Sequence, residues 1–184
     1  MIPLKNKPTK FFRDVTVFVG AIILHSCISA KDLSSTQLVD LSGVSNLGGN
    51  YNITGFFMNN KYYGTVGRGV GGGGTDCCIA IPKNWRPDMK IVVQWTVSVW
   101  DENLQPNASG TYEAPKVIGV YRAAVPVEKY DKPGTLYVHF FKGGKTRIVS
   151  SEFGALSPKH PILLNDPRAS STATQGDKIS AALK

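Results

Sequence analysis

Residues 90–100, KIVVQWTVSVW, decide the fold class of this chain. From Trp95 to Val99, apolar side chains at every second position alternate with Thr96 and Ser98. A period of two residues is typical of a β-strand that buries one of its faces. We therefore expect a half-buried strand over this stretch.

Short runs of apolar and aromatic residues, separated by turn residues, recur along the chain at 51–58, 62–66, 77–81, 116–125, 134–141 and 146–149. Asn59-Asn60 joins the first two runs, and Asn tolerates the positive φ of a tight hairpin turn. Gly143-Gly144 joins the last two by the same chemistry. With no strong helical period between them, these runs predict an all-β fold. We expect an antiparallel β-sandwich, Ig-like or a partly open barrel, of about seven strands.

The N-terminal residues 1–26 have the pattern of a lipoprotein signal peptide. A basic start precedes the ten-residue apolar run VTVFVGAIIL at 15–24, and a membrane-spanning helix needs about 20 such residues. The next residues, Leu-His-Ser-Cys, resemble the bacterial lipoprotein box, in which Cys27 receives the lipid. His25 departs from that pattern, and an ordinary secretory signal or an uncleaved anchor is the alternative. Ile28 after the Cys points to the outer membrane.

Composition divides the rest of the chain into three segments. Residues 27–47 are rich in Ser and have little periodicity, so we expect a tether between lipid and domain. Residues 48–164 hold all the predicted strands and form the β-sandwich domain. Residues 165–184 are small and polar, which predicts a disordered tail.

Charge excludes one class of function. The chain has 184 residues, with 21 basic and 13 acidic side chains and a net charge of +8. Loss of residues 1–26 would lower that charge to +5. The remaining basic residues are scattered, whereas nucleic-acid binding needs a concentrated basic face. We therefore expect no nucleic acid among the partners.

Cys77 and Cys78 are adjacent, and three interpretations of them stay open. They are two reduced thiols, a vicinal disulfide, which the oxidising envelope would permit, or a reactive thiol. Their spacing fits no metal motif. Outside the signal, the only histidines are His139 and His160, which are distant in sequence. We expect no metal site and no cofactor.

A catalytic set is also hard to assemble. His139 lies in a strand pattern, His160 lies between prolines in a rigid turn, and no Gly-x-Ser-x-Gly motif is present. Asp101 and Glu102 are adjacent at a strand end, where they begin a loop. The sequence therefore predicts a protein that is not an enzyme.

Two loops are candidates for binding a partner. The run at 67–74, GRGVGGGG, lacks the Gly-Lys-Ser/Thr of a phosphate-binding loop, and we interpret it as a loop that approaches another surface closely, with Arg68 at its tip. The second, at 82–87, brackets Trp85 with prolines beside two cations, and Trp and Arg are common interface anchors. The predicted partner-binding residues at one end of the sandwich are Arg68, Gly69, Gly71, Gly72, Asp76, Lys83, Trp85 and Arg86.

The order of these motifs resembles a family of Gram-negative envelope lipoproteins catalogued as domain of unknown function 3304. The resemblance covers 51–161 and rests on the Gly-rich run followed by Cys77-Cys78, Pro82, Trp85, the Val93-x-Trp95-x-Val97 pattern, LYVHF at 136–140 and His160-Pro161. It implies an immunity protein that binds and inhibits a type VI secreted lipase or phospholipase in the periplasm. No catalytic residue comes with it. The alternative is a structural envelope lipoprotein that binds cell-wall or outer-membrane components.

Overall fold

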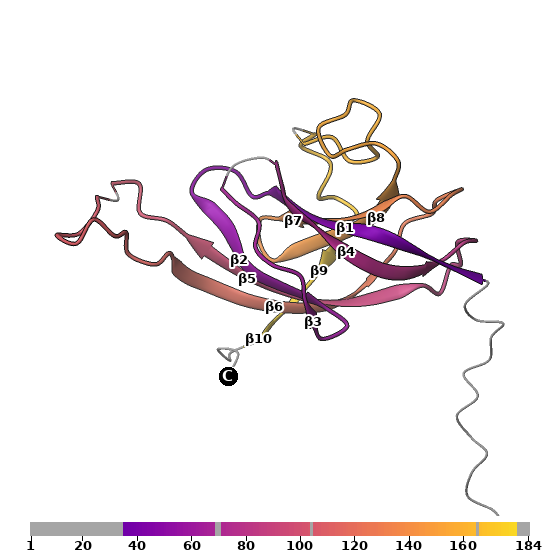
Figure 1. Cartoon of the computed structure of the whole chain (residues 1–184), viewed down its shortest axis with the longest axis horizontal. Coiled ribbons are helices and arrows are strands. Elements are labelled where there is room, and N and C mark those ends of the chain that lie inside the picture. The colour runs from indigo at the N-terminus through magenta and orange to yellow at the C-terminus, as the bar shows by residue number, and fades with distance from the viewer. Residues whose placement is uncertain (1–34, 69–70, 104, 165, 180–184) are drawn as a thin grey trace, which may run out of the picture.

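The computed structural model describes residues 35–68, 71–103, 105–164 and 166–179, with the side chains of 71–75 left aside. Figure 1 shows these residues as two facing layers of β-strands. One sheet has the order β4 (Gly71–Pro82), β1 (Thr36–Asn46), β7 (Thr135–Phe141), β8 (Lys145–Ser151) and β9 (Thr174–Gln175). The other has the order β10 (Asp177–Ile179), β6 (Lys116–Pro126), β5 (Lys90–Val99), β2 (Tyr51–Met58) and β3 (Lys61–Tyr62). The all-β sandwich is confirmed, and it is not closed into a barrel. No helix in this part of the chain is long and apolar enough to cross a membrane.

The main core fills the space between the two sheets. Trp95 on β5 is fully buried and stacks on Tyr121 of β6, with ring centroids 5.7 Å apart. On the facing sheet, Phe140 meets Trp95 at 5.9 Å and Phe56 at 5.4 Å. Trp95 and Val97 thus point inward, as the sequence predicts, but the alternation breaks after them: Ser98 is fully buried and Val99 half-buried, where the register with β6 shifts between Val97 and Ser98.

Both predicted hairpin turns have the expected backbone. Asn59 and Asn60 have φ of 47° and 67° between β2 and β3. Gly143 and Gly144 have φ of 74° and 73° between β7 and β8. A two-residue turn with positive φ at both positions matches the right-handed twist of the strands it joins.

Two predicted strand boundaries are wrong. The run 62–66 contributes only Tyr62 to the two-residue β3, and Val66 forms an isolated bridge to Ile53. Gly64, with φ of 104°, breaks the extended backbone between them. Residues 71–74, expected in a loop, begin β4, where Gly71 pairs with Ser45 of β1. Glycine carries the same backbone N–H and C=O groups as other residues, so it can form the hydrogen bonds of a sheet when a neighbouring strand is present.

The expected tether at 27–47 is wrong for residues 36–46. They form β1, which lies between β4 and β7 in the middle of a sheet. Val39, Leu41 and Val44 are buried there, and so is the polar Ser45. β1 pairs with β7 in parallel, so this sheet is mixed rather than antiparallel. The strands between β1 and β7 supply the crossover that a parallel pair requires.

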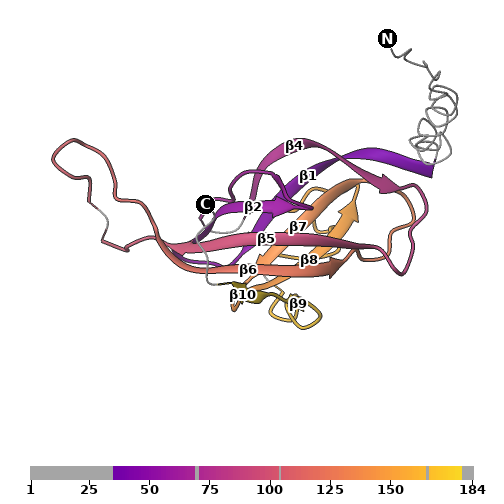
Figure 2. The same ribbon diagram turned by 90° about the horizontal axis from the view of Figure 1, so that it is seen from below.

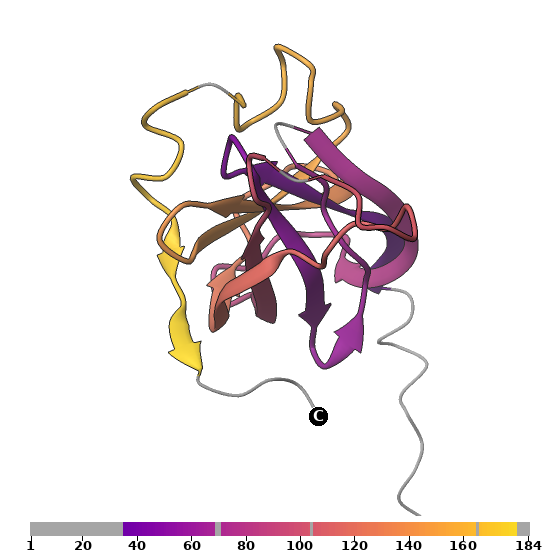
Figure 3. The ribbon, with the colours of Figure 1, turned by 90° about the vertical axis from the view of Figure 1, so that its left-hand side faces the viewer.

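The expected disordered tail is wrong for residues 166–179. β9 pairs with β8, and β10 pairs with β6, so that this segment extends both sheets. Ala169 is buried in a second, smaller core on the outer face of the β1–β7–β8 sheet, together with Val44, Tyr137, Phe141, Val149 and Ile162. Figure 3 shows the chain after β8 as a layer of loops above that sheet. The apolar outer face of the sheet is what orders this segment.

Candidate functional site

The two predicted binding loops lie at opposite ends of the sandwich. β4 runs from Gly71, opposite Ser45, to Pro82, opposite Thr36. Its twelve residues span about 36 Å at the usual rise of a strand. Arg68 therefore lies at one end and Lys83 at the other, so the single end face that the sequence predicted does not form.

Arg68 lies beside a long arm at its end of the molecule. Its guanidinium is 5.2 Å from the centre of the Trp100 ring, a cation–π contact. Trp100 follows β5, and residues 105–115 then form the arm, which projects from the sandwich in Figures 1 and 2. At its base, a hollow of about 260 Å³ is lined by Trp100, Asp101 and Glu113 among others.

The tip of the arm is held by its own hydrogen bonds. The Asn107 side-chain oxygen accepts from the backbone N–H groups of Ser109 and Thr111, at 3.1 and 3.0 Å, and from the Ser109 hydroxyl at 2.6 Å. The Asn107 backbone N–H donates to the Thr111 carbonyl at 2.8 Å. Tyr112, just beyond this turn, is 59% exposed. The sequence analysis predicted a loop beginning at Asp101 but not its ordered tip, although an Asn followed two residues later by Ser is a typical side-chain-capped turn.

At the other end, Trp85 has a structural position. Its indole N–H donates to the Val127 carbonyl at 2.8 Å, and its ring packs against the main core. Arg86 is exposed and lies 3.7 Å from Asp88. Lys83 is exposed, and its backbone N–H donates to the Ser35 carbonyl at 2.8 Å. These contacts fix the loop to the strand that begins the described chain.

The remaining predicted residues are placed along β4 or fall outside the description. Gly71 and Gly72 pair with Ser45 and Val44 of β1. Asp76 is exposed on β4; together with burial, the stronger cause, its charge raises the pKa of Tyr63. Cys27 and Gly69 lie outside the described residues, so lipidation of Cys27 stays a prediction.

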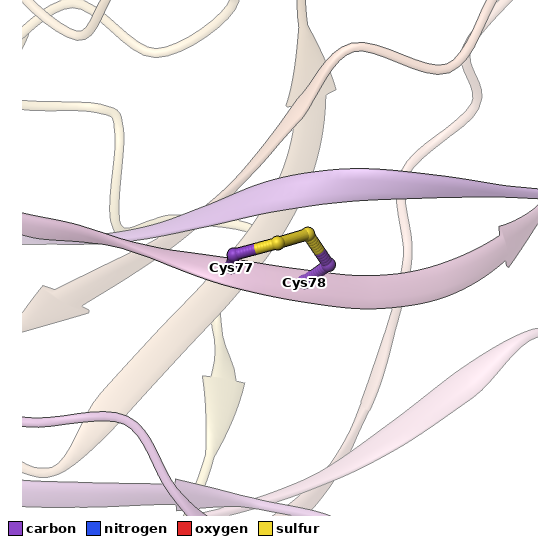
Figure 4. The surroundings of a disulfide bond; sticks show 2 residues. All are labelled: Cys77 and Cys78. Carbon is purple, nitrogen blue, oxygen red and sulfur yellow. A yellow bond between two sulfur atoms is a disulfide. The ribbon is translucent and has the colours of Figure 1, made fainter.

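Cys77 and Cys78 are joined by a disulfide on β4 (Figure 4), with a cis peptide bond between them and Cα atoms 3.1 Å apart. The side-chain ligand atoms of Asp40, Cys77 and Cys78 lie within 4.8 Å of one another. Metals bind thiolates, and in the disulfide neither sulfur is a thiolate. The cluster is therefore a set of ligands only for a reduced form of the protein.

A buried pair of histidines is the feature that the sequence analysis missed. His139 on β7 and His160 in the loop after β8 are 0% and 3% exposed. Their Nε2 atoms lie 3.0 Å apart. His139 Nδ1 lies 2.9 Å from the Asn46 side-chain oxygen, and His160 Nδ1 lies 2.9 Å from the Phe153 carbonyl. Spacing in the sequence gives no sign of this pair, because only the loop layer brings His160 onto the sheet.

The surroundings keep both rings neutral near pH 7. Burial, with smaller contributions from His160 and Arg147, lowers the pKa of His139 to about 3. Burial also lowers the pKa of His160, against a hydrogen bond to Phe153 that raises it. Neither cysteine lies near this pair. In the strand register, the disulfide on β4 lies opposite Asp40 of β1, whereas His139 on β7 lies opposite Val44 of β1. A Cys–His catalytic pair, which would have favoured an enzyme, does not form.

The fold and its exposed arm define a two-sheet β-sandwich with a preordered loop at one end. The family described as Protein of unknown function (DUF3304) matches residues 48–148, more than half of the chain, and the chain belongs to this family. No curated protein and no solved structure matches it. The family match omits β1, which lies at the centre of one sheet, and it also omits His160.

Proposed function

We propose that this protein is a lipid-anchored immunity protein of the bacterial envelope, which binds a type VI secreted lipase or phospholipase in the periplasm and blocks it. Membership in the DUF3304 family supports this proposal. The lipoprotein-box pattern that ends at Cys27 also supports it. Inhibition needs a rigid scaffold and an exposed binding surface, and it needs no catalytic group.

The observation that carries the proposal is the preordered arm at the end far from Ser35, where the described chain begins. Asn107 fixes the arm through three accepted hydrogen bonds, so little conformational entropy is lost on binding. Tyr112 supplies an exposed aromatic ring on the arm, and the exposed Arg68, against Trp100 at its base, supplies a cation; these are residue types that dominate protein interfaces.

The predicted lipid anchor would also orient the domain relative to the membrane. Ser35 is only eight positions after Cys27 in the chain, so a lipid on Cys27 would hold Ser35 within about 28 Å of the membrane. Ser35 lies at the Lys83 end, as its hydrogen bond to Lys83 requires. The arm would then project away from the membrane, toward an enzyme arriving in the periplasm. We infer that it covers the mouth of the lipase active site.

The test is co-purification and inhibition with the lipase encoded by the adjacent gene. An Arg68→Ala/Tyr112→Ala variant should weaken inhibition by roughly 30-fold or more, since two interface anchors are worth at least about 2 kcal/mol. A Lys83→Ala/Arg86→Ala variant is the matched control at the opposite end, and it should inhibit normally.

Two outcomes would contradict the proposal. Weaker inhibition in the control alone would place the interface at the Lys83 end. No affinity for the lipase, together with binding to isolated cell-wall or outer-membrane fractions, would favour a structural envelope protein instead.

A further inference from the structure

The chain of hydrogen bonds through the two buried histidines joins the sheet to the loop layer. We call Asn46, His139, His160 and the Phe153 carbonyl the histidine chain. Asn46 and His139 lie on β1 and β7, whereas Phe153 and His160 belong to the segment 152–164 that follows β8. The chain is one polar connection between that segment and the sheet. The Asn46–Leu164 and Ser151–Phe153 hydrogen bonds and the apolar contacts of Ile162 in the second core are the others described.

The number of protons in this chain follows from its end groups. The Phe153 carbonyl can only accept, so His160 must carry its hydrogen on Nδ1. A neutral His160 then accepts at Nε2, and His139 must donate from its own Nε2 across the 3.0 Å contact. His139 Nδ1 is thereby an acceptor, so the Asn46 amide must turn its NH₂ group toward it. Every member of the histidine chain is then paired, and the Asn46–Leu164 hydrogen bond is given up.

One added proton gives a second complete arrangement. If the Asn46 oxygen accepts from His139 Nδ1 at 2.9 Å, its NH₂ group donates to the Leu164 carbonyl at 3.4 Å. Both Nδ1 atoms then carry hydrogen, and the Nε2 atoms share one extra proton. The two arrangements differ by one proton and by a half-turn of the Asn46 amide. A second added proton has no place, because it would leave two imidazolium N–H groups facing each other at 3.0 Å in a buried site.

The charged groups around the pair do little to offset an added charge. Arg147 on β8 is the register partner of His139, but Glu128 binds it through both carboxylate oxygens at 2.6 and 2.9 Å. Tyr137 on β7 contacts the His160 ring edge-on, with ring centroids 4.7 Å apart. On the Asn46 side, the nearby hollow is lined by two cations and one anion, Lys142, Lys145 and Asp166.

We propose that the histidine chain is a proton-operated latch, which holds segment 152–164 on the sheet when neutral and releases it when both rings are protonated. Release uncovers the second core on the outer face of the sheet, while the main core between the sheets stays closed. The opening is local because the main core shares none of its buried residues with the second. The latch would make the accessibility of this face depend on the pH outside the cytoplasm.

Hydrogen exchange on the full chain, corrected for the intrinsic pH dependence of exchange, measures the opening. The His160 amide, which donates to the Ser157 carbonyl at 3.0 Å, reports on the segment. Rings freed in the open form bind one or two more protons than in the closed form, so the open population should rise about 10- to 100-fold per pH unit below pH 6.5. The Val127 amide, bonded to the Met89 carbonyl at 3.0 Å, reports on the main core. Its protection also falls with pH, because unfolding frees the same rings, but it should stay well above that of His160 at every pH.

Two variants make the test independent of any general loss of stability. Asn46→Asp places a carboxylate on His139 Nδ1, favours the charged ring in the closed form, and should therefore move the opening to lower pH. His160→Gln removes one titrating ring and should flatten the pH dependence. In the wild-type protein at pH 7, ¹⁵N shifts should show His160 protonated on Nδ1. Exchange at His160 that is independent of pH, equal protection of the His160 and Val127 amides, or an upward shift for Asn46→Asp would each overturn the proposal.

Discussion

Replacing Arg147 by Met should destabilise the domain more than replacing any exposed arginine. Arg147 donates to both Glu128 oxygens, at 2.6 and 2.9 Å, and to the Ala169 carbonyl at 2.7 Å. Its side chain is 15% exposed, and that of Glu128 is 37% exposed. It thus ties β8 to the chain after β6 and to the loop layer.

The magnitude follows from these three bonds. A hydrogen bond to a charged group contributes about 1.5–3 kcal/mol, but the half-exposed Glu128 recovers part of this from water when it is left alone. We therefore expect a loss of about 3 kcal/mol in the free energy of unfolding, or roughly 10 °C in Tm for a domain of this size.

Arg168→Ala is the matched control. Arg168 is 87% exposed and touches a single carboxylate, that of Asp166, at 3.5 Å, so its loss should cost about 0.5 kcal/mol or less. Urea denaturation at pH 7, followed by tryptophan fluorescence, measures both variants. If Arg147→Met costs less than about 1 kcal/mol, or no more than the control, the bidentate pair is not the connection described here.

Two further predictions concern stability in acid and the turn between β7 and β8. The pKa of His139 is about 3 in the folded state and near 6.5 in the unfolded state, so the unfolded state binds more protons between these values. The free energy of unfolding should therefore fall by about 1.4 kcal/mol per pH unit below pH 6.5. Urea denaturation at pH 7, 6 and 5 measures this fall, and a constant free energy of unfolding would contradict the neutral pair. Gly144→Ala should destabilise the domain by about 2–4 kcal/mol, since the added Cβ would overlap the Tyr121 ring. Gly143→Ala has open space at a similar positive φ and should cost about 1 kcal/mol. Equal shifts in Tm for the two variants would refute the close approach of Gly144 to Tyr121.

The local part of the fold was predictable from the residues alone. Alternation in 95–99 and the Asn59-Asn60 and Gly143-Gly144 turns reflect neighbouring residues and backbone sterics, so they hold wherever the strands lie. They give the all-β class and most strand positions. The candidate loops were recognisable as loops for the same reason, and Arg68 and Trp85 do lie where the strand pattern is interrupted.

Relations between distant residues were decided only by the tertiary structure. Residues 36–46 have a weak strand pattern of their own and become β1 because β4 and β7 offer ladders on both sides. Length along β4 separates Arg68 from Lys83, which the sequence analysis had assigned to one face. His139 and His160 meet because an apolar outer face binds the loop layer. Pairing partners and burial are properties of the whole packed chain, and no local pattern of residues contains them.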